Sequence, residues 1–244
     1  MSIMISAARQ CTRFRDPLTC TGHYLMPVLE GEPATLEASA IRSGKRTETV
    51  SVSFMQRDVE RVRFCGTFGD FAAQQDVSDV TRSAVDYNDG PRPIDQMPHP
   101  DACTDKLWRA LQQMQIGTLY ADAVQFVVPD DSPFIKGLMS GNNQEEPRID
   151  AHVSFQDGRE PCLRSLALFN DCLPPAVLNW AGRAAWVPTI EYSVHFYARP
   201  KPGPLRASFR ADTIRYGMST INGEVQDSEG NVCSVSRQLS TIRV

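Results

Sequence analysis

The stretch TLEASAIRSGKRTETVSV, residues 35–52, recurs in altered form as SFRADTIRYGMSTINGEV, residues 208–225. The match extends outward without a gap to 24–52 and 197–225, where nine of 29 positions are identical, against about two expected from composition. Both copies alternate in polarity and share an Ile-Arg-x-Gly motif, which predicts two strands joined by a turn or bulge. We interpret the repeat as an internal duplication. Two unrelated hairpins with similar turns are the alternative.

The rest of the chain divides around these two copies. A polar stretch at 70–106 and another at 130–147 are typical of loops, because Pro, Gly, Asn and Asp gather in them. Periodicity elsewhere predicts helices at 104–115 and 162–180, strands at 119–129 and 148–157, and an antiparallel meander over 186–244. The second copy therefore consists of a strand, an apolar helix and a meander.

The first copy is shorter than the second at its N-terminal side. Shifting the helix at 162–180 back by 173 residues moves most of it ahead of Met1, so that only MISAARQ is left as its tail. The strand before that helix has no counterpart. We expect two units, 1–130 and 131–244, the first of them incomplete. The first unit is either naturally shortened or has its start codon set too late, and we favour the second explanation.

Composition excludes several classes of protein. With 41% hydrophobic and 22% charged residues, the 244-residue chain is an ordinary globular protein. A net charge of −4 without a Lys/Arg-rich block argues against a nucleic-acid-binding role. No apolar run approaches the roughly 20 residues that span a bilayer. Seven scattered cysteines and four isolated histidines predict a reducing, cytoplasmic setting and no metal site.

One acid stands out in the segment RSLALFNDCLPPAVLN, residues 164–179. Asp171 lies between Phe169 and the pair Pro174-Pro175, in a segment without the stripe of charges that a solvated helix carries. Burying an unpaired carboxylate costs several kcal/mol or raises its pKa. Asp171 therefore either caps a short helix or has a chemical role.

Three motifs resemble the acyl-CoA thioesterase II family and related thioesterase-like proteins: NDCLPPAVLN (170–179), WVPTIEYSVHFYARP (186–200) and GNVCSVSRQLSTI (230–242). The resemblance is strongest over the last 80 or so residues and looser through 17–68. It implies an α+β double hotdog fold, in which two antiparallel sheets each wrap a helix. It also implies a catalytic set of Asp171, Thr189 and Gln238. No cofactor or metal is implied, the substrate is an acyl-CoA or acyl-carrier thioester, and a homodimer is an expectation.

The chemistry of these side chains suits thioester hydrolysis, which needs an activated water and a stabilised oxyanion. Asp171 can accept the proton of the water, while Thr189 and Gln238 both donate and accept hydrogen bonds. Backbone N–H groups freed by the break at Pro174-Pro175 are candidate oxyanion donors. Each residue also has an ordinary explanation: a helix cap, a generic strand residue, and a solvated strand face.

The first copy provides an internal control. At the offset of 173, Thr189 aligns with Asp16 and Gln238 with Cys65, so the N-terminal half has no second catalytic set. We expect it to form a wall of the acyl pocket. A carrier-protein thioesterase and a non-catalytic acyl-binding protein are the alternative functions.

Other side chains fit less specific roles. Trp180 and Trp186 could line an acyl tunnel or pack in the core. Arg199 and Lys201 could meet CoA phosphates or be solvated, and we expect His195 to be structural.

Overall fold

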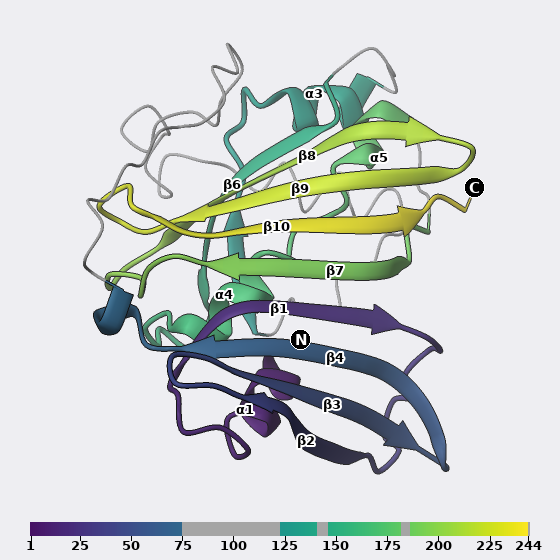
Figure 1. Ribbon diagram of the computed structural model, residues 1–244. Helices are drawn as coiled ribbons and strands as arrows, with labels where there is room; N and C mark the ends of the chain where they lie inside the picture. The colour runs from purple at the N-terminus through teal and green to yellow at the C-terminus, as the bar shows by residue number, and fades with distance from the viewer. Residues whose placement is uncertain (75–122, 141–145, 182–185, 244) are drawn as a thin grey trace.

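The computed structural model describes residues 1–74, 123–140, 146–181 and 186–243, and its strands form one large sheet (Figure 1). The strands are β1 (Asp16–Tyr24), β2 (Thr35–Ser43), β3 (Glu48–Gln56), β4 (Val59–Gly69), β5 (Val124–Val127), β6 (Arg148–Phe155), β7 (Thr189–Phe196), β8 (Leu205–Arg215), β9 (Met218–Gln226) and β10 (Val232–Thr241). They pair in the order β2-β3-β4-β1-β7-β10-β9-β8-β6-β5, always antiparallel.

The order of the strands is symmetric about the middle of the sheet. β2-β3-β4-β1 on one side mirrors β8-β9-β10-β7 on the other, and β1 pairs with β7 at the centre. The two segments of the sequence repeat form the hairpins β2-β3 and β8-β9, as the alternating pattern predicts. β8 continues into β6 and β5, whereas no strand in the described ranges lies beyond β2.

The gapless alignment of the two copies fails beyond the first strand of each hairpin. Between β2 and β3 the turn covers 44–47 and is closed by a hydrogen bond from the N–H of Gly44 to the carbonyl of Thr47 (2.9 Å). Between β8 and β9 it shrinks to Tyr216 and Gly217, whose φ angles of 52° and 69° suit a type I′ turn. Turn length sets the register of a hairpin, so identical residues after the turn are not structural counterparts.

Matching bulges identify the true counterparts of the expected catalytic residues. Pro17 pairs with Phe68 just before a bulge in β1, and Thr189 pairs with Ser240 just before the same bulge in β7. Counted from these bulges, Thr189 corresponds to Pro17 and Gln238 to Gly66. The expected matches to Asp16 and Cys65 were therefore wrong by one residue. A slip of one residue reverses the face of a strand, and Cys65 is exposed whereas Gln238 is buried.

Helices lie behind the sheet in the view of Figure 1, where α1 backs one half and α4 the other. The helices are α1 (Ser2–Ala8), α3 (Pro133–Ser140), α4 (Leu163–Phe169) and α5 (Val177–Ala181), with a 3₁₀ turn η1 (Phe71–Gln74). α1 packs against α4, β2, β3 and β4. The core between helices and sheet includes Ile5, Phe64, Phe169 and Val194, each fully buried.

Two predicted segments differ from the structure. The expected loop at 130–147 contains α3, because Ser132 caps the helix through a hydrogen bond from the N–H of Ile135 (3.2 Å) and Pro133 suits the first helical position. The expected single helix at 162–180 is divided into α4 and α5, since prolines at 174 and 175 interrupt it.

The other predicted elements fare differently. The strand predicted at 148–157 is present as β6, and that at 119–129 is represented by β5. The predicted helix at 104–115 and most of the predicted linker lie outside the described residues.

Candidate active site

Asp171 lies in the interruption between α4 and α5. Its N–H donates to the carbonyl of Leu168 (2.9 Å), which continues the last turn of α4. The chain cannot extend this helix further, because Pro174 and Pro175 lack the N–H groups that a helix interior requires. The carboxylate is thus held at the end of a helix, over the inner face of the sheet.

The three residues expected to act together are brought together. Gln238, on the inner face of β10 and 6% exposed, donates from Nε2 to Oδ1 of Asp171 (2.9 Å). Its Oε1 atom lies 3.5 Å from Oγ1 of Thr189, the first residue of β7. The second contact is at the outer limit of a hydrogen bond. The amide of Gln238 therefore links the hydroxyl to the carboxylate, while Oδ2 of Asp171 accepts no hydrogen bond within the described ranges.

Burial makes Asp171 more basic. Desolvation raises the pKa of its carboxyl group from 3.8 to about 6, while the ammonium group of Met1 and the hydrogen bond from Gln238 act in the opposite direction. At neutral pH the carboxylate is still ionised. It is then a stronger proton acceptor than an exposed Asp, which suits a general base.

Asn170 is a polar residue of this site whose role the sequence analysis missed. It is fully buried, and its Nδ2 atom donates to the carbonyl of Leu166 (2.9 Å) and to the hydroxyl of Ser234 on β10 (2.7 Å). Its own carbonyl accepts a hydrogen bond from Nε2 of Gln238 (3.2 Å). The end of α4 is thereby fastened to β10 next to Asp171. The available signal was a second polar residue, adjacent to the acid, in an otherwise apolar segment.

Tyr192 fastens the same helix from the neighbouring strand. Its side chain is fully buried on β7, and its hydroxyl donates to the carbonyl of Ala167 (2.9 Å). Because β7 carries both Tyr192 and Thr189, this bond helps to set the distance between Thr189 and the end of α4.

The interruption after α4 also leaves backbone donors unused. The buried N–H groups of Leu173 and Ala176 make no hydrogen bond to any residue that the structure describes. Unpaired buried N–H groups are rare in native proteins. Leu173 is two residues from Asp171, so its N–H group is close in sequence to the general base.

The weaker expectations from sequence do not converge on this site. Trp180 and Trp186 are 39% and 65% exposed, so neither is a core residue. Arg199 forms an ion pair with the buried Asp16, whose other oxygen accepts the N–H of Phe71 (3.2 Å).

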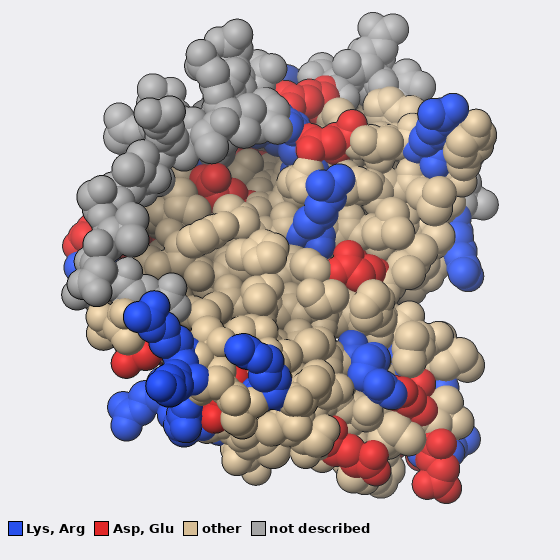
Figure 2. All heavy atoms as spheres, in the orientation of Figure 1, with Lys and Arg blue, Asp and Glu red and all other residues tan. Residues whose placement is uncertain are grey.

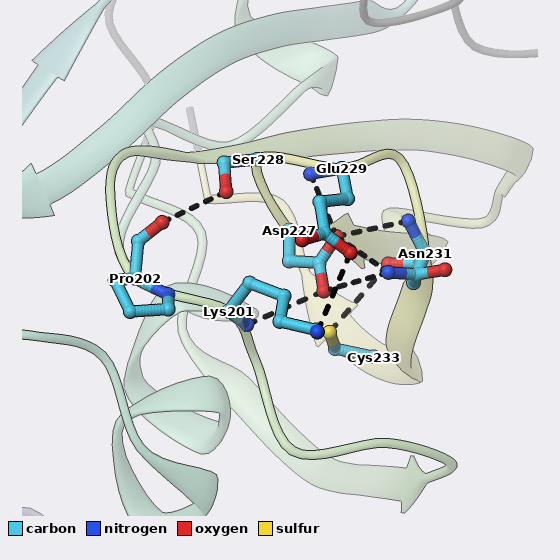
Figure 3. A network of polar contacts seen from close by, with 7 residues as sticks. All are labelled: Lys201, Pro202, Asp227, Ser228, Glu229, Asn231 and Cys233. Atoms are coloured by element: carbon cyan, nitrogen blue, oxygen red, sulfur yellow. Dashed lines mark hydrogen bonds and ion pairs between the residues drawn. The ribbon is translucent and has the colours of Figure 1, made fainter.

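The second basic candidate, Lys201, belongs to a polar network around the β9-β10 turn (Figure 3). Asp227 is fully buried there and accepts the backbone N–H groups of Lys201 (3.3 Å), Glu229 (3.0 Å) and Asn231 (3.0 Å). The Nζ atom of Lys201 lies 3.5 Å from a carboxylate oxygen of Glu229. This network fastens the segment after β7 to the turn, and we assign it a structural role.

Metal-ion and membrane features are also limited to what the described residues can show. Within those ranges no three His, Cys, Asp or Glu side chains are grouped to hold a metal ion. No helix there is long and apolar enough to cross a bilayer.

The fold is that of hotdog proteins of known structure. A conserved protein with a hot dog fold from Alicyclobacillus acidocaldarius matches with a TM-score of 0.75 at 20% identity, over 100% of this chain and 85% of that one. A candidate thioesterase II from Thermobifida fusca matches with a TM-score of 0.79 at 21% identity, over 100% and 85%. The acyl-CoA thioesterase II TesB2 from Mycobacterium marinum matches with a TM-score of 0.64 at 13% identity, over 99% and 86%.

Sequence models of a family match most of the chain. The model of the acyl-CoA thioesterase N-terminal domain matches residues 1–69, and that of the acyl-CoA thioesterase C-terminal domain matches 97–242. The chain therefore belongs to the acyl-CoA thioesterase family. No curated protein matches it.

Proposed function

We propose that the protein hydrolyses fatty-acyl or related thioesters of CoA, with Asp171 as the general base. The observation that carries this proposal is the linked arrangement of Thr189, Gln238 and Asp171 around a carboxylate whose pKa is raised to about 6. Such a perturbed acid with fixed hydrogen-bond partners is typical of catalytic sites.

The reaction can be followed atom by atom. Oδ2 of Asp171 accepts a proton from a water whose oxygen attacks the thioester carbonyl carbon, while the hydroxyl of Thr189 helps to orient that water. The carbonyl oxygen becomes an oxyanion, for which we propose the N–H of Leu173 as a donor. When the tetrahedral intermediate collapses, the C–S bond breaks and the thiolate leaves with the proton from Asp171. The products are a carboxylic acid and a free thiol.

We further propose a double hotdog built from units 1–130 and 131–244, the first of them incomplete. Their symmetric strand order supports this division, and the pairing of β5 with β6 places residues 124–127 against the second unit. The first unit carries Pro17 and Gly66 where the second carries Thr189 and Gln238. It therefore contributes a wall rather than a second set of catalytic groups. A cytoplasmic location and a homodimer stay predictions.

The test is the release of free thiol from acyl-CoAs of increasing chain length, by the wild type and by Asp171→Asn. Loss of the general base is expected to lower turnover by about a hundredfold or more. Equal and negligible rates in both proteins, with properly folded chains, would refute hydrolysis. Activity on an acyl-carrier protein alone would favour the carrier-protein alternative. Binding of acyl-CoA without turnover would favour a non-catalytic acyl-binding protein.

A further inference from the structure

The end of the sheet nearest Thr189 carries an exposed group of aromatic, sulfur-containing and basic side chains. We name it the end patch: Trp186, Arg215, Tyr216, Met218 and Arg243. Trp186, Tyr216 and Met218 are 65%, 83% and 42% exposed, and both arginines are exposed. Single exposed apolar residues need no explanation, but several together at one place mark an interaction site.

Strand pairing places these residues together on one face. Arg215 pairs with Met218, Met218 pairs with Thr241, and Trp186 pairs with Arg243 two residues further on. The β8-β9 turn reaches the same strand, because the N–H of Ile242 donates to the carbonyl of Gly217 (2.7 Å). Paired residues of antiparallel strands point to the same face, and so do residues two apart. This face is the one opposite the helices.

The end patch combines two kinds of recognition. The guanidinium of Arg215 lies over the ring of Tyr216, 4.8 Å from its centre, and its Nη2 donates to the tyrosine hydroxyl (3.2 Å), so this pair is already ordered. Arg215 and Arg243 contribute positive charge, and the patch contains no acid. Figure 2 shows basic side chains at the right-hand edge, where β8 and β10 end and β9 begins, without an Asp or Glu between them.

A planar ring joined to phosphates matches this chemistry. Bases stack on exposed Trp and Tyr rings, and arginines bind phosphate through paired N–H groups. The end patch also lies within reach of the candidate active site, since Trp186 is three residues before Thr189, about 10 Å along an extended chain. Thr189 faces the helix side of the sheet end and the end patch the other side. A ligand passing over this end would therefore touch both.

We propose that the end patch binds the nucleotide end of CoA while the pantetheine arm passes over the sheet end to the thioester at Asp171. This inference rests on the proposed hydrolysis of acyl-CoA and adds what selects CoA as the donor. Trp186 and Tyr216 stack on the adenine, and Arg215 and Arg243 bind the phosphates.

The experiment compares an acyl-CoA with the acyl-pantetheine that carries the same acyl group but no nucleotide. The variants are Trp186→Ala, Arg243→Ala and the double variant. Tyr197→Ala and Arg237→Ala serve as controls, because Tyr197 is 61% exposed beyond the opposite end of β7 and Arg237 is exposed on β10 away from the patch. Each patch variant is expected to raise KM for acyl-CoA about tenfold or more, with kcat unchanged. KM for acyl-pantetheine and the kinetics of both controls stay as in the wild type.

A second measurement does not depend on turnover: calorimetric titration with adenosine 3′,5′-bisphosphate. The wild type and the controls are expected to bind it, and the double variant is not. Unchanged KM for acyl-CoA in the double variant, or an equal rise for acyl-pantetheine, would overturn the assignment. Failure of the wild type to bind the bisphosphate would overturn it too. Bisphosphate binding without hydrolysis of any thioester would refute the proposed function while leaving the nucleotide site in place.

Discussion

Replacing Asp171 with Asn is expected to stabilise the folded protein at neutral pH while abolishing activity. Burial raises the pKa of this carboxyl group from 3.8 to about 6, so the folded chain binds its proton more tightly than the unfolded chain does. Stability therefore falls as the pH rises from about 4 to about 6, and remains low at higher pH. An amide of the same shape carries no charge, so its burial does not have this cost.

The size of the effect follows from the shift in pKa. A difference of about two pKa units between the folded and unfolded chains corresponds to about 3 kcal/mol, and the Asn variant should be more stable by up to that amount at pH 8. Below pH 4 the carboxyl group is protonated in both states, and the difference should disappear. The amide oxygen of Asn can still accept the hydrogen bond from Gln238.

Urea unfolding of both proteins between pH 4 and pH 8 provides the assay. Asp227→Asn is the matched control, because the pKa of Asp227 is shifted the other way. Burial raises it, but hydrogen bonds from Asn231, Lys201 and Glu229 outweigh burial and hold it below its usual value. This control should lose about 1–3 kcal/mol at neutral pH. A stability difference for Asp171→Asn that does not change with pH, or that favours the wild type at pH 8, would refute the account of a desolvated carboxylate.

Three further outcomes are expected. Thr189→Val, which keeps the shape and removes the hydroxyl, should lower kcat/KM about tenfold to a hundredfold in the thiol-release assay. An unchanged rate would show that Thr189 does not orient the water. The kcat/KM of the wild type should rise about tenfold per pH unit up to about pH 6 and then level off as Asp171 loses its proton, whereas a flat profile from pH 5 to 7 would contradict this role. Asn170→Ala should cost about 2–3 kcal/mol in urea unfolding and also lower kcat, because the end of α4 is no longer fastened to β10. Loss of stability with full activity would leave Asn170 a purely structural residue.

Local patterns in the sequence predicted the strands and the identity of the candidate catalytic residues. Alternation with a period of two is a property of each strand by itself, so it identified β2, β3, β8 and β9. Asp171, Thr189 and Gln238 were found from the order and spacing of three motifs that resemble a family. Their contact could not be calculated from the sequence, because Asp171 and Gln238 meet across 67 residues.

The register between the two copies could not be predicted in the same way. Turn lengths differ within each copy, and differences in successive turns partly cancel along the chain. Thr47 and Thr220 are identical and aligned, yet Thr47 lies in a turn and Thr220 in β9. Asn170 was missed for a related reason. An amide next to an acid has no meaning in the sequence until Ser234 from a distant strand binds it.

The two halves of the sheet differ chemically where their backbones correspond. The inner-face positions Ser236, Gln238 and Ser240 of β10 correspond to Phe64, Gly66 and Phe68 of β4, as counted from the matching bulges. A Cβ atom on Gly66 would lie 2.7 Å from the Cζ atom of Phe64, so phenylalanine rings occupy the space that a side chain at this position would need.

This contrast explains why one half can support chemistry and the other cannot. Buried polar residues are tolerated only where hydrogen-bond partners meet them. Ser234 and Gln238 find their partners at the end of α4, where the chain breaks at Pro174 and presents Asn170 and Asp171. In β4 the apolar rings require no such partners and form a tightly packed wall. The packed half and the polar half are therefore complementary: one stabilises the sheet, and the other holds a desolvated carboxylate over it.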